Sequence, residues 1–114
     1  PPGAGKTTLV PLALIDEPWL KHRKILMLEP RRIATRSAAY RMASLLNERP
    51  GQTIGYRMRL DTKVSKQSKV EVITEGILTR MLQDDPSLGE VGLVIFDEFH
   101  ERSLDSDLAL SVQR

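Results

Sequence analysis

Apolar runs of strand length alternate along this chain with segments of helical periodicity. Residues 25–28, 70–73 and 91–96 are mainly apolar, and each is followed by a segment that favours a helix. Strands that are buried on both faces of a parallel sheet have this composition, and helices connect them. The alternation therefore predicts the α/β class, with a mostly parallel sheet flanked by helices.

Helical spacing of apolar residues is clearest between residues 31 and 47. Arg32 and Arg36 lie one turn apart on a different face from the apolar side chains, and Pro50-Gly51 ends the helix. The apolar face of this predicted helix consists of Ala34, Ala38, Met42, Leu45 and Leu46.

Three further helices are expected. The first runs from Lys6 to about Asp16, with a bend at Pro11 and an end near Pro18. The second ends at Asp84-Asp85-Pro86, and the third lies near the carboxyl terminus. The apolar side of the second consists of Ile77, Leu78, Met81 and Leu82, and that of the third of Leu104, Leu108 and Val112.

Residues 54–60 alternate in polarity with a period of two, which predicts a strand. Its apolar side consists of Ile54, Tyr56, Met58 and Leu60. Arg57 and Arg59 then share the other side, either as contacts to nucleic acid or as solvated strand charges. The polar residues 61–69 predict a loop.

The composition excludes several classes of protein. The 114 residues are enough for one domain, and 40% hydrophobic with 28% charged residues is typical of a globular protein. The uncharged stretches, such as residues 7–15, are far shorter than the ~20 residues that span a bilayer, so no membrane partner is expected. The chain has no Cys and two distant His, which argues against disulfides and zinc and favours a reducing, cytoplasmic setting.

The net charge of +2 conceals a strong asymmetry. Residues 19–66 contain 12 Lys or Arg and three acids, a net charge of +9, whereas residues 67–114 have a net charge of −6. A basic segment is by default a solvated face. Its Pro-Arg-Arg sequence and alternating Arg residues, however, indicate contacts to phosphate.

Residues 1–8 match the end of a phosphate-binding loop, with Gly5, Lys6 and Thr7 as its closing Gly-Lys-Thr. Glycines turn backbone N–H groups toward a polyphosphate, and the following helix adds a favourable dipole. Lys6 would lie near the β and γ phosphates, and the Thr7 hydroxyl is a ligand suited to Mg²⁺. The alternative is a Gly/Pro turn followed by an exposed Lys.

Two adjacent carboxylates, Asp97 and Glu98, directly follow the apolar run at residues 91–96. Open α/β sheets bind ligands at the carboxyl ends of their strands. Asp97 would hold Mg²⁺, and Glu98 would orient or deprotonate the water that attacks the γ phosphate. An acidic turn after a core strand is the alternative, and from the residues alone His100 can equally be a surface histidine. Together with the phosphate loop, the pair indicates nucleoside triphosphate hydrolysis.

Four segments in order resemble motifs of the DEAH-box branch of the superfamily 2 helicases. Residues 2–8 resemble motif I, residues 29–34 (Glu-Pro-Arg-Arg-Ile-Ala) motif Ia, residues 74–78 (Thr-Glu-Gly-Ile-Leu) motif Ib and residues 97–100 (Asp-Glu-Phe-His) motif II. Arg31 and His100 distinguish this branch from DEAD-box proteins. Phe99 stands where the family has Ala, and this form of motif II is similar to that of a bacterial member. The resemblance implies the first RecA-like domain of an ATP-dependent RNA helicase.

The resemblance also implies a role for each matched residue. Gly3, Ala4, Gly5, Lys6, Thr7 and Thr8 would bind ATP, Thr7, Asp97 and Glu98 would surround Mg²⁺, and Glu98, Lys6 and His100 would serve catalysis. His100 would couple the ATP site to a later motif. Arg41 would stack on the base, although a solvated helical Arg is nearly as good an interpretation. Arg31, Arg32, Thr74 and Gly76 would contact single-stranded RNA, and DNA remains open as a substrate.

The chain starts at Pro1, directly on an active-looking segment, so we expect it to be a fragment, truncated at both ends, of a longer parent protein. A second RecA-like domain of that protein would complete the ATP site, so the fragment by itself should be nearly inactive. A strand preceding residue 1 would lie beside residues 91–96, whose edge should otherwise be exposed. The rival interpretations are a phosphate-loop ATPase that drives a process without nucleic acid and a non-enzymatic adaptor with a degenerate nucleotide site.

Overall fold

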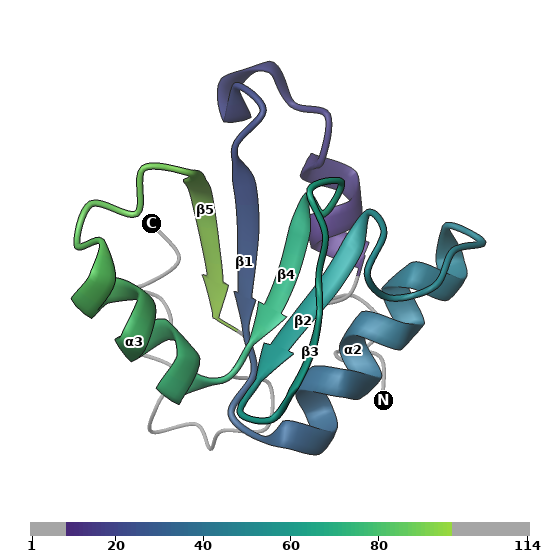
Figure 1. Ribbon diagram of the computed structural model, residues 1–114. Helices are drawn as coiled ribbons and strands as arrows, with labels where there is room; N and C mark the ends of the chain where they lie inside the picture. The colour runs from purple at the N-terminus through teal and green to yellow at the C-terminus, as the bar shows by residue number, and fades with distance from the viewer. Residues whose placement is uncertain (1–8, 97–114) are drawn as a thin grey trace, which may run out of the picture.

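The computed structural model of the chain describes residues 9–96, and its strands form one five-stranded sheet. The strands are β1 (Lys24–Leu28), β2 (Ile54–Met58), β3 (Asp61–Lys63), β4 (Val70–Ile73) and β5 (Val91–Phe96). Their order across the sheet is β3-β2-β4-β1-β5, as Figure 1 shows. The pairings among β2, β4, β1 and β5 are parallel, and β3 is antiparallel to β2. The predicted α/β class is confirmed.

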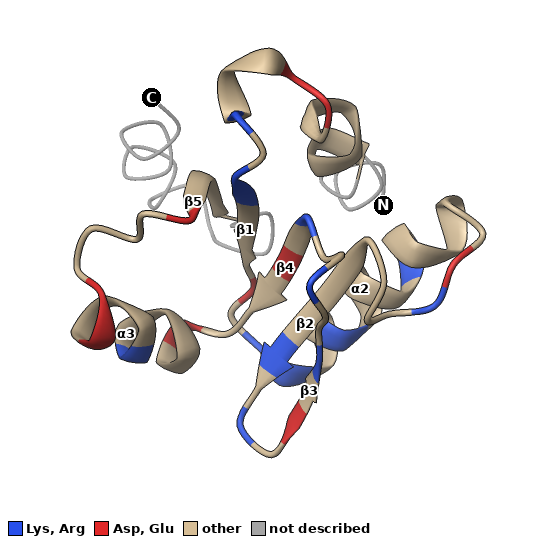
Figure 2. Cartoon of the chain, turned by 45° about the horizontal axis from the view of Figure 1, so that its top comes forward, with Lys and Arg blue, Asp and Glu red and all other residues tan. Residues whose placement is uncertain are grey.

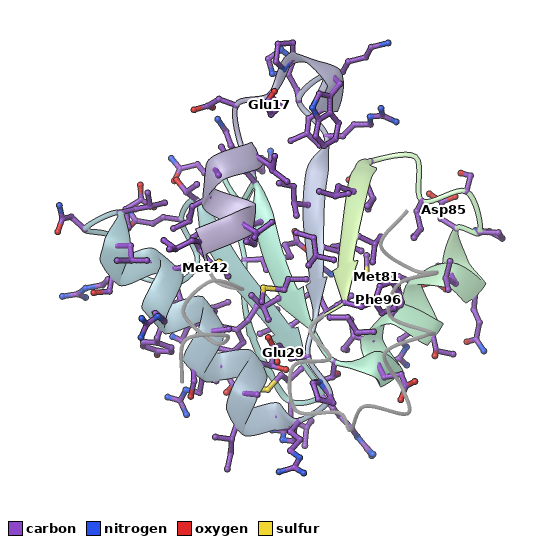
Figure 3. All side chains as sticks on the ribbon, turned by 180° about the vertical axis from the view of Figure 1, so that it is seen from behind. Glu17, Glu29, Met42, Met81, Asp85 and Phe96 are labelled. Atoms are coloured by element: carbon purple, nitrogen blue, oxygen red, sulfur yellow. The ribbon has the colours of Figure 1, made fainter. Side chains whose placement is uncertain are left out.

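The helices are α2 (Arg32–Leu45) and α3 (Glu75–Asp84), with a 3-10 turn η1 (Pro18–Leu20). Residues 9–14 are also helical, and Pro18 starts the turn that follows them. Seen from behind, α2 and this first helix lie over the same face of the sheet (Figure 3). α3 follows β4 and lies beside β5, at the other side of the molecule from α2 (Figure 1). The helix predicted around Leu104 lies outside the described residues.

The main core lies between α2 and the sheet. In β2 the alternation predicted from the sequence is observed, because Ile54, Tyr56 and Met58 all face this core. Leu45 was expected on the apolar face of α2, but its side chain is 51% exposed. The side of the helix that is buried differs from the expected one and consists mostly of small side chains. Small side chains allow the helix to pack closely against β2 and β4. The buried residues of α2 are Thr35, Ala38, Ala39, Met42 and Ala43.

The prediction of one strand through residue 60 followed by a polar loop was wrong. β2 ends at Met58, the chain turns at Arg59 and Leu60, and β3 pairs back along β2. Leu60 has a φ of 69° in this turn and its side chain is 95% exposed. Period-two alternation continues across a tight hairpin, so the pattern alone could not show where the strand reverses.

Tyr56 joins this hairpin to the core. Its ring is fully buried on β2, and its hydroxyl donates a 2.9 Å hydrogen bond to Oδ1 of Asp61 on β3. Burial, reinforced by this hydrogen bond, raises the pKa of Tyr56 from 10.0 to about 12. The folded protein therefore keeps this proton at a pH where the unfolded chain has lost it.

Replacing Tyr56 by Phe should lower stability by about 1 kcal/mol near neutral pH through loss of the hydrogen bond. Because the raised pKa stabilises the fold only while the proton is retained, the advantage of wild type should be full below pH 10 and lost as pH rises toward 12. Thermal unfolding of both forms of the parent protein across a pH series measures this difference. A constant difference between pH 9 and pH 12 would contradict the assignment.

β5 forms one edge of the described sheet. It pairs with β1, and all six of its residues are half-buried, in contrast to the fully buried centre of β1. α3 also presents a half-exposed apolar side, with Leu82 at 40% exposure and no fully buried residue. The expected exposure of this strand edge remains a prediction. None of the helices in residues 9–96 is of the length and apolarity that crossing a membrane requires.

Candidate nucleic-acid interface and nucleotide site

Three parallel strands end level with one another. Leu28 of β1 pairs with Ile73 of β4 and with Phe96 of β5. The backbone N–H of Glu29 then donates a 3.0 Å hydrogen bond to the Ile73 carbonyl, which holds the first residue after β1 against the last residue of β4. The segments that resemble motifs Ia and Ib therefore leave the sheet side by side. Phe96, at the same level, directly precedes the acidic pair in the sequence.

Arg31 occupies the cap position at the start of α2. Its backbone is extended, with φ −129° and ψ 149°. The Arg31 carbonyl accepts hydrogen bonds from both the backbone N–H and the hydroxyl of Thr35, at 2.9 and 2.8 Å. Thr35 is fully buried, so these bonds fix the backbone of Arg31, while its side chain makes no capping bond and is exposed. Hydrogen bonds thus hold the backbone of Arg31 in place, while its guanidinium group is accessible to a ligand.

Arg32 lies in the first turn of α2 and is tethered to the β2–β3 turn. Its Nη1 donates a 2.7 Å hydrogen bond to the carbonyl of Arg59. An Arg has five N–H donors, so most remain for other partners. The bond brings Arg59 next to the motif Ia segment, a contact between residues 27 positions apart that sequence reasoning did not foresee. Figure 2 shows Lys and Arg gathered on α2, β2 and β3, in agreement with the basic middle of the sequence.

Thr74 and Gly76 lie at the junction of β4 and α3. Thr74 is the cap residue of α3, and its side chain makes no capping hydrogen bond. Gly76 follows in the first turn, where a Cβ would meet no atom within 4 Å. The junction thus presents a hydroxyl and an unobstructed backbone near the positive end of the helix dipole. Both features suit contacts with a sugar-phosphate backbone.

Arg41 is separated from these four residues. It is exposed on α2, nine residues after Arg32, which is about 14 Å along a helix axis. The structure therefore brings Arg31, Arg32, Thr74 and Gly76 to one edge of the sheet, the one formed by the carboxyl ends of the parallel strands. Arg41 lies away from this edge. Its expected contact with a base remains a prediction.

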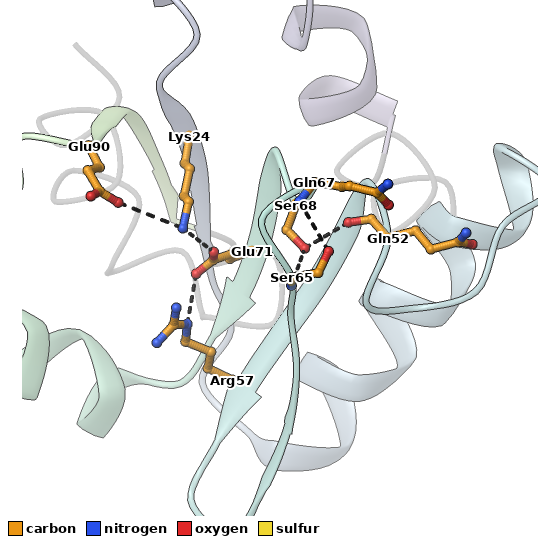
Figure 4. Close-up of polar contacts among 8 residues, drawn as sticks. All are labelled: Lys24, Gln52, Arg57, Ser65, Gln67, Ser68, Glu71 and Glu90. Carbon is orange, nitrogen blue, oxygen red and sulfur yellow. Dashed lines mark hydrogen bonds and ion pairs between the residues drawn. The ribbon is translucent and has the colours of Figure 1, made fainter.

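Sequence reasoning missed a cluster of charged side chains on the strands that lead to this edge. The carboxylate of Glu71 in β4 bonds Lys24 of β1 and Arg57 of β2, at 2.7 and 2.9 Å (Figure 4). Glu71 was hidden within a run predicted as a core strand. The signal that could have found it is a lone charge in that run, since a buried charge requires a partner.

The residues expected to hold the ATP phosphates and Mg²⁺ lie outside the described part of the chain. They are Gly3, Ala4, Gly5, Lys6, Thr7, Thr8, Asp97, Glu98 and His100. Within residues 9–96, no group of three or more His, Cys, Asp or Glu side chains could hold a metal ion.

Comparisons with known proteins agree with the four motifs. A family model described as DEAD/DEAH box helicase matches residues 1–109. The chain is 58% identical over 112 residues to the ATP-dependent RNA helicase HrpB of Escherichia coli (strain K12), covering 98% of this chain and 14% of that protein. It is 38% identical over 112 residues to the ATP-dependent RNA helicase HrpA of Borreliella burgdorferi, covering 98% of this chain and 14% of that protein.

The fold agrees as well. A crystal structure of the Escherichia coli DEAH/RHA helicase HrpB matches with a TM-score of 0.79 and 57% sequence identity. The match covers 96% of this chain and 14% of the solved chain, so the sequence spans about one seventh of these relatives. Motif order, family model and sheet topology thus lead to one assignment: the chain belongs to the DEAD/DEAH box helicase family, and its fold is similar to that of the RecA-like domain of HrpB.

Proposed function

We propose that the chain is part of the first RecA-like domain of an ATP-dependent RNA helicase, in which ATP hydrolysis drives movement along, or unwinding of, RNA. One observation carries the proposal. Arg31-Arg32 and Thr74-Gly76 leave adjacent parallel strands at the edge where β5 also ends, one residue before Asp97. An RNA surface and an ATP site on one edge would allow hydrolysis to change the grip on RNA directly.

The ATP site would be built from both ends of the chain. Gly3, Ala4, Gly5 and Thr8 would present backbone N–H groups to the phosphates, and Lys6 would add a full positive charge. The Thr7 hydroxyl and the Asp97 carboxylate are hard oxygen ligands, a donor set that fits Mg²⁺. Bound Mg²⁺ would neutralise charge on the triphosphate. Glu98 would accept a proton from the attacking water. His100 would couple the ATP site to a later motif of the parent protein.

The RNA surface would bind the phosphates of RNA without recognising its base sequence. Arg31 and Arg32 offer planar guanidinium groups that bond phosphate oxygens in pairs. The Thr74 hydroxyl and the backbone at Gly76 would add neutral donors. Contacts of this kind position a strand and carry little information about its bases. Arg41, further along α2, would lie against the ATP base.

The second RecA-like domain would supply the Arg that stabilises charge in the transition state. The chain covers 14% of HrpB, so the remaining parts of the site would come from elsewhere in the parent protein. We expect these 114 residues alone neither to unwind RNA nor to hydrolyse ATP at a family-like rate. The compartment consistent with this proposal is the bacterial cytoplasm.

Replacing Arg32 by Ala in the parent protein should weaken binding of single-stranded RNA about tenfold, since a charge-assisted bond to phosphate is lost. The slope of log K against log salt should fall in magnitude by about 0.7, the value for one phosphate contact on a single strand. Arg49→Ala is the matched control, because Arg49 is also exposed but follows the opposite end of α2. Equal effects of the two substitutions would contradict the placement of the RNA surface.

ATPase rates with and without single-stranded RNA distinguish the proposal from an ATPase that serves another process. The helicase account predicts a rate that rises with RNA, and in Arg32→Ala the half-maximal rise should need about tenfold more RNA. A rate that is indifferent to RNA would support the rival, and the absence of any hydrolysis would support an adaptor.

A further inference from the structure

Glu71 is a buried carboxylate held by two cations on the face of the sheet. Its side chain is 1% exposed. Oε2 accepts a 2.7 Å bond from Nζ of Lys24, and Oε1 accepts a 2.9 Å bond from Nε of Arg57. The three residues come from β1, β4 and β2, three neighbouring strands (Figure 4). Each carboxylate oxygen is thus committed to a different cation.

Stability is a weak reason for such a cluster. The three strands are already joined by backbone hydrogen bonds, and a buried ion pair is often no more stabilising than apolar side chains of the same volume. The charges also do not balance within the cluster, because one carboxylate faces two cations. Lys24 has a second acid, Glu90, at 4.0 Å. Within residues 9–96, Arg57 has an ion pair with Glu71 only, and because Glu71 is shared with Lys24, part of the positive charge of Arg57 remains available.

Arg57 lies at the edge where the RNA surface is proposed. It pairs across the ladder with Ile73, the residue directly before Thr74. Its side chain is 36% exposed, although the carboxylate that holds it is buried. Among residues 9–96, Nε is the only guanidinium nitrogen of Arg57 in a hydrogen bond. In Figure 4 the guanidinium of Arg57 lies on the side of Glu71 toward α3.

We propose that Arg57 contacts an RNA phosphate through its two terminal nitrogens and that Glu71 is the positioning residue that fixes its guanidinium. A carboxylate bound at Nε holds the planar group in one orientation and leaves the edge formed by the two terminal nitrogens for a bidentate phosphate contact. The phosphate would be the one beside Thr74 and Gly76. This inference rests on the proposed function, because it adds a residue to that RNA surface.

The test measures binding of a labelled oligouridine to the parent protein across a salt series. Arg57→Gln should weaken binding about tenfold and lower the magnitude of the salt slope by about 0.7. Lys24→Gln is the matched control, because it removes the other cation of the same carboxylate and should leave both quantities unchanged. Glu71→Gln should weaken binding severalfold in wild type and have little further effect in the Arg57→Gln background.

The possible outcomes distinguish a failure of this inference from a failure of the proposed function. If wild type does not bind RNA, the proposed function fails. If wild type binds, and Arg57→Gln and Lys24→Gln have the same effect, the cluster is structural and the inference is overturned.

Should Arg57→Gln fail to fold, the variant Arg57→Lys provides the test. One ammonium cannot serve Glu71 and a phosphate bidentately, so that variant should fold, keep most of the slope and bind severalfold more weakly. Binding by Arg57→Lys at the wild-type level would overturn the inference.

Discussion

Glu98→Gln in the parent protein should lower ATP turnover by a factor of about 10² to 10⁴, the usual contribution of a general base, while ATP still binds. An amide has nearly the shape of the carboxylate but cannot take a proton from the attacking water. Thr7, Asp97 and the backbone of the phosphate loop are unchanged, so nucleotide affinity should stay close to that of wild type. Steady-state ATPase rates and the Kd of a fluorescent ATP analogue measure the two quantities separately.

Glu101→Gln is the control for this prediction. It makes the same chemical change three residues later, beyond the motif, and should leave turnover near the wild-type rate. A Glu98→Gln variant that hydrolyses ATP normally would remove Glu98 from its assigned role. Loss of ATP binding together with turnover would instead assign Glu98 to holding the nucleotide.

Gly55→Ala should destabilise the sheet by about 1–3 kcal/mol, the usual cost of overpacking a filled interior. A Cβ at Gly55 would lie 2.7 Å from the carbonyl oxygen of Lys63 and 2.7 Å from Cγ1 of Val64. The segment after β3 cannot easily move away, because the Ser68 hydroxyl anchors it with a 2.7 Å hydrogen bond to the Gln52 carbonyl. Native-state hydrogen exchange of the β2 amides in the parent protein measures the change in opening free energy.

Gly76→Ala provides the contrast. Gly76 is in the first turn of α3, where an added Cβ would meet nothing within 4 Å. Ala is favoured over Gly in a helix by roughly 0.5–1 kcal/mol, so this variant should be as stable as wild type or slightly more stable. If both substitutions change stability by the same amount, the close approach over Gly55 is not what makes glycine necessary there.

The elements of the fold could largely be predicted from local pattern. The cores of β1, β4 and β5 are apolar runs, and α2 was predicted within two residues at each end because Pro30, Pro50 and Gly51 bound its periodic segment. The end of α3 at Asp84 was likewise marked by Asp85-Pro86. These signals act over a few residues, which is why a single sequence shows them.

Long-range features could not be predicted in this way. The sheet order places β4 between β1 and β2, although β4 follows both in the sequence, and no local signal encodes that insertion. The bond from Arg32 to Arg59 and the Lys24–Glu71–Arg57 cluster depend on this order, since each joins residues that only the folded sheet brings together. The alternation through Leu60 was misleading for the same reason, because the fold decides where a hairpin turns.

The central claim is that the phosphate loop and the acidic pair meet on one nucleotide beside the RNA surface. A crystal structure of the parent protein with Mg²⁺ and a non-hydrolysable ATP analogue tests it directly. We predict Lys6 on the triphosphate, Asp97 in the shell of the metal, and both at the edge formed by the ends of β1, β4 and β5. A structure in which Lys6 and Asp97 lie on opposite sides of the domain, with the nucleotide touching only one of them, would contradict the account.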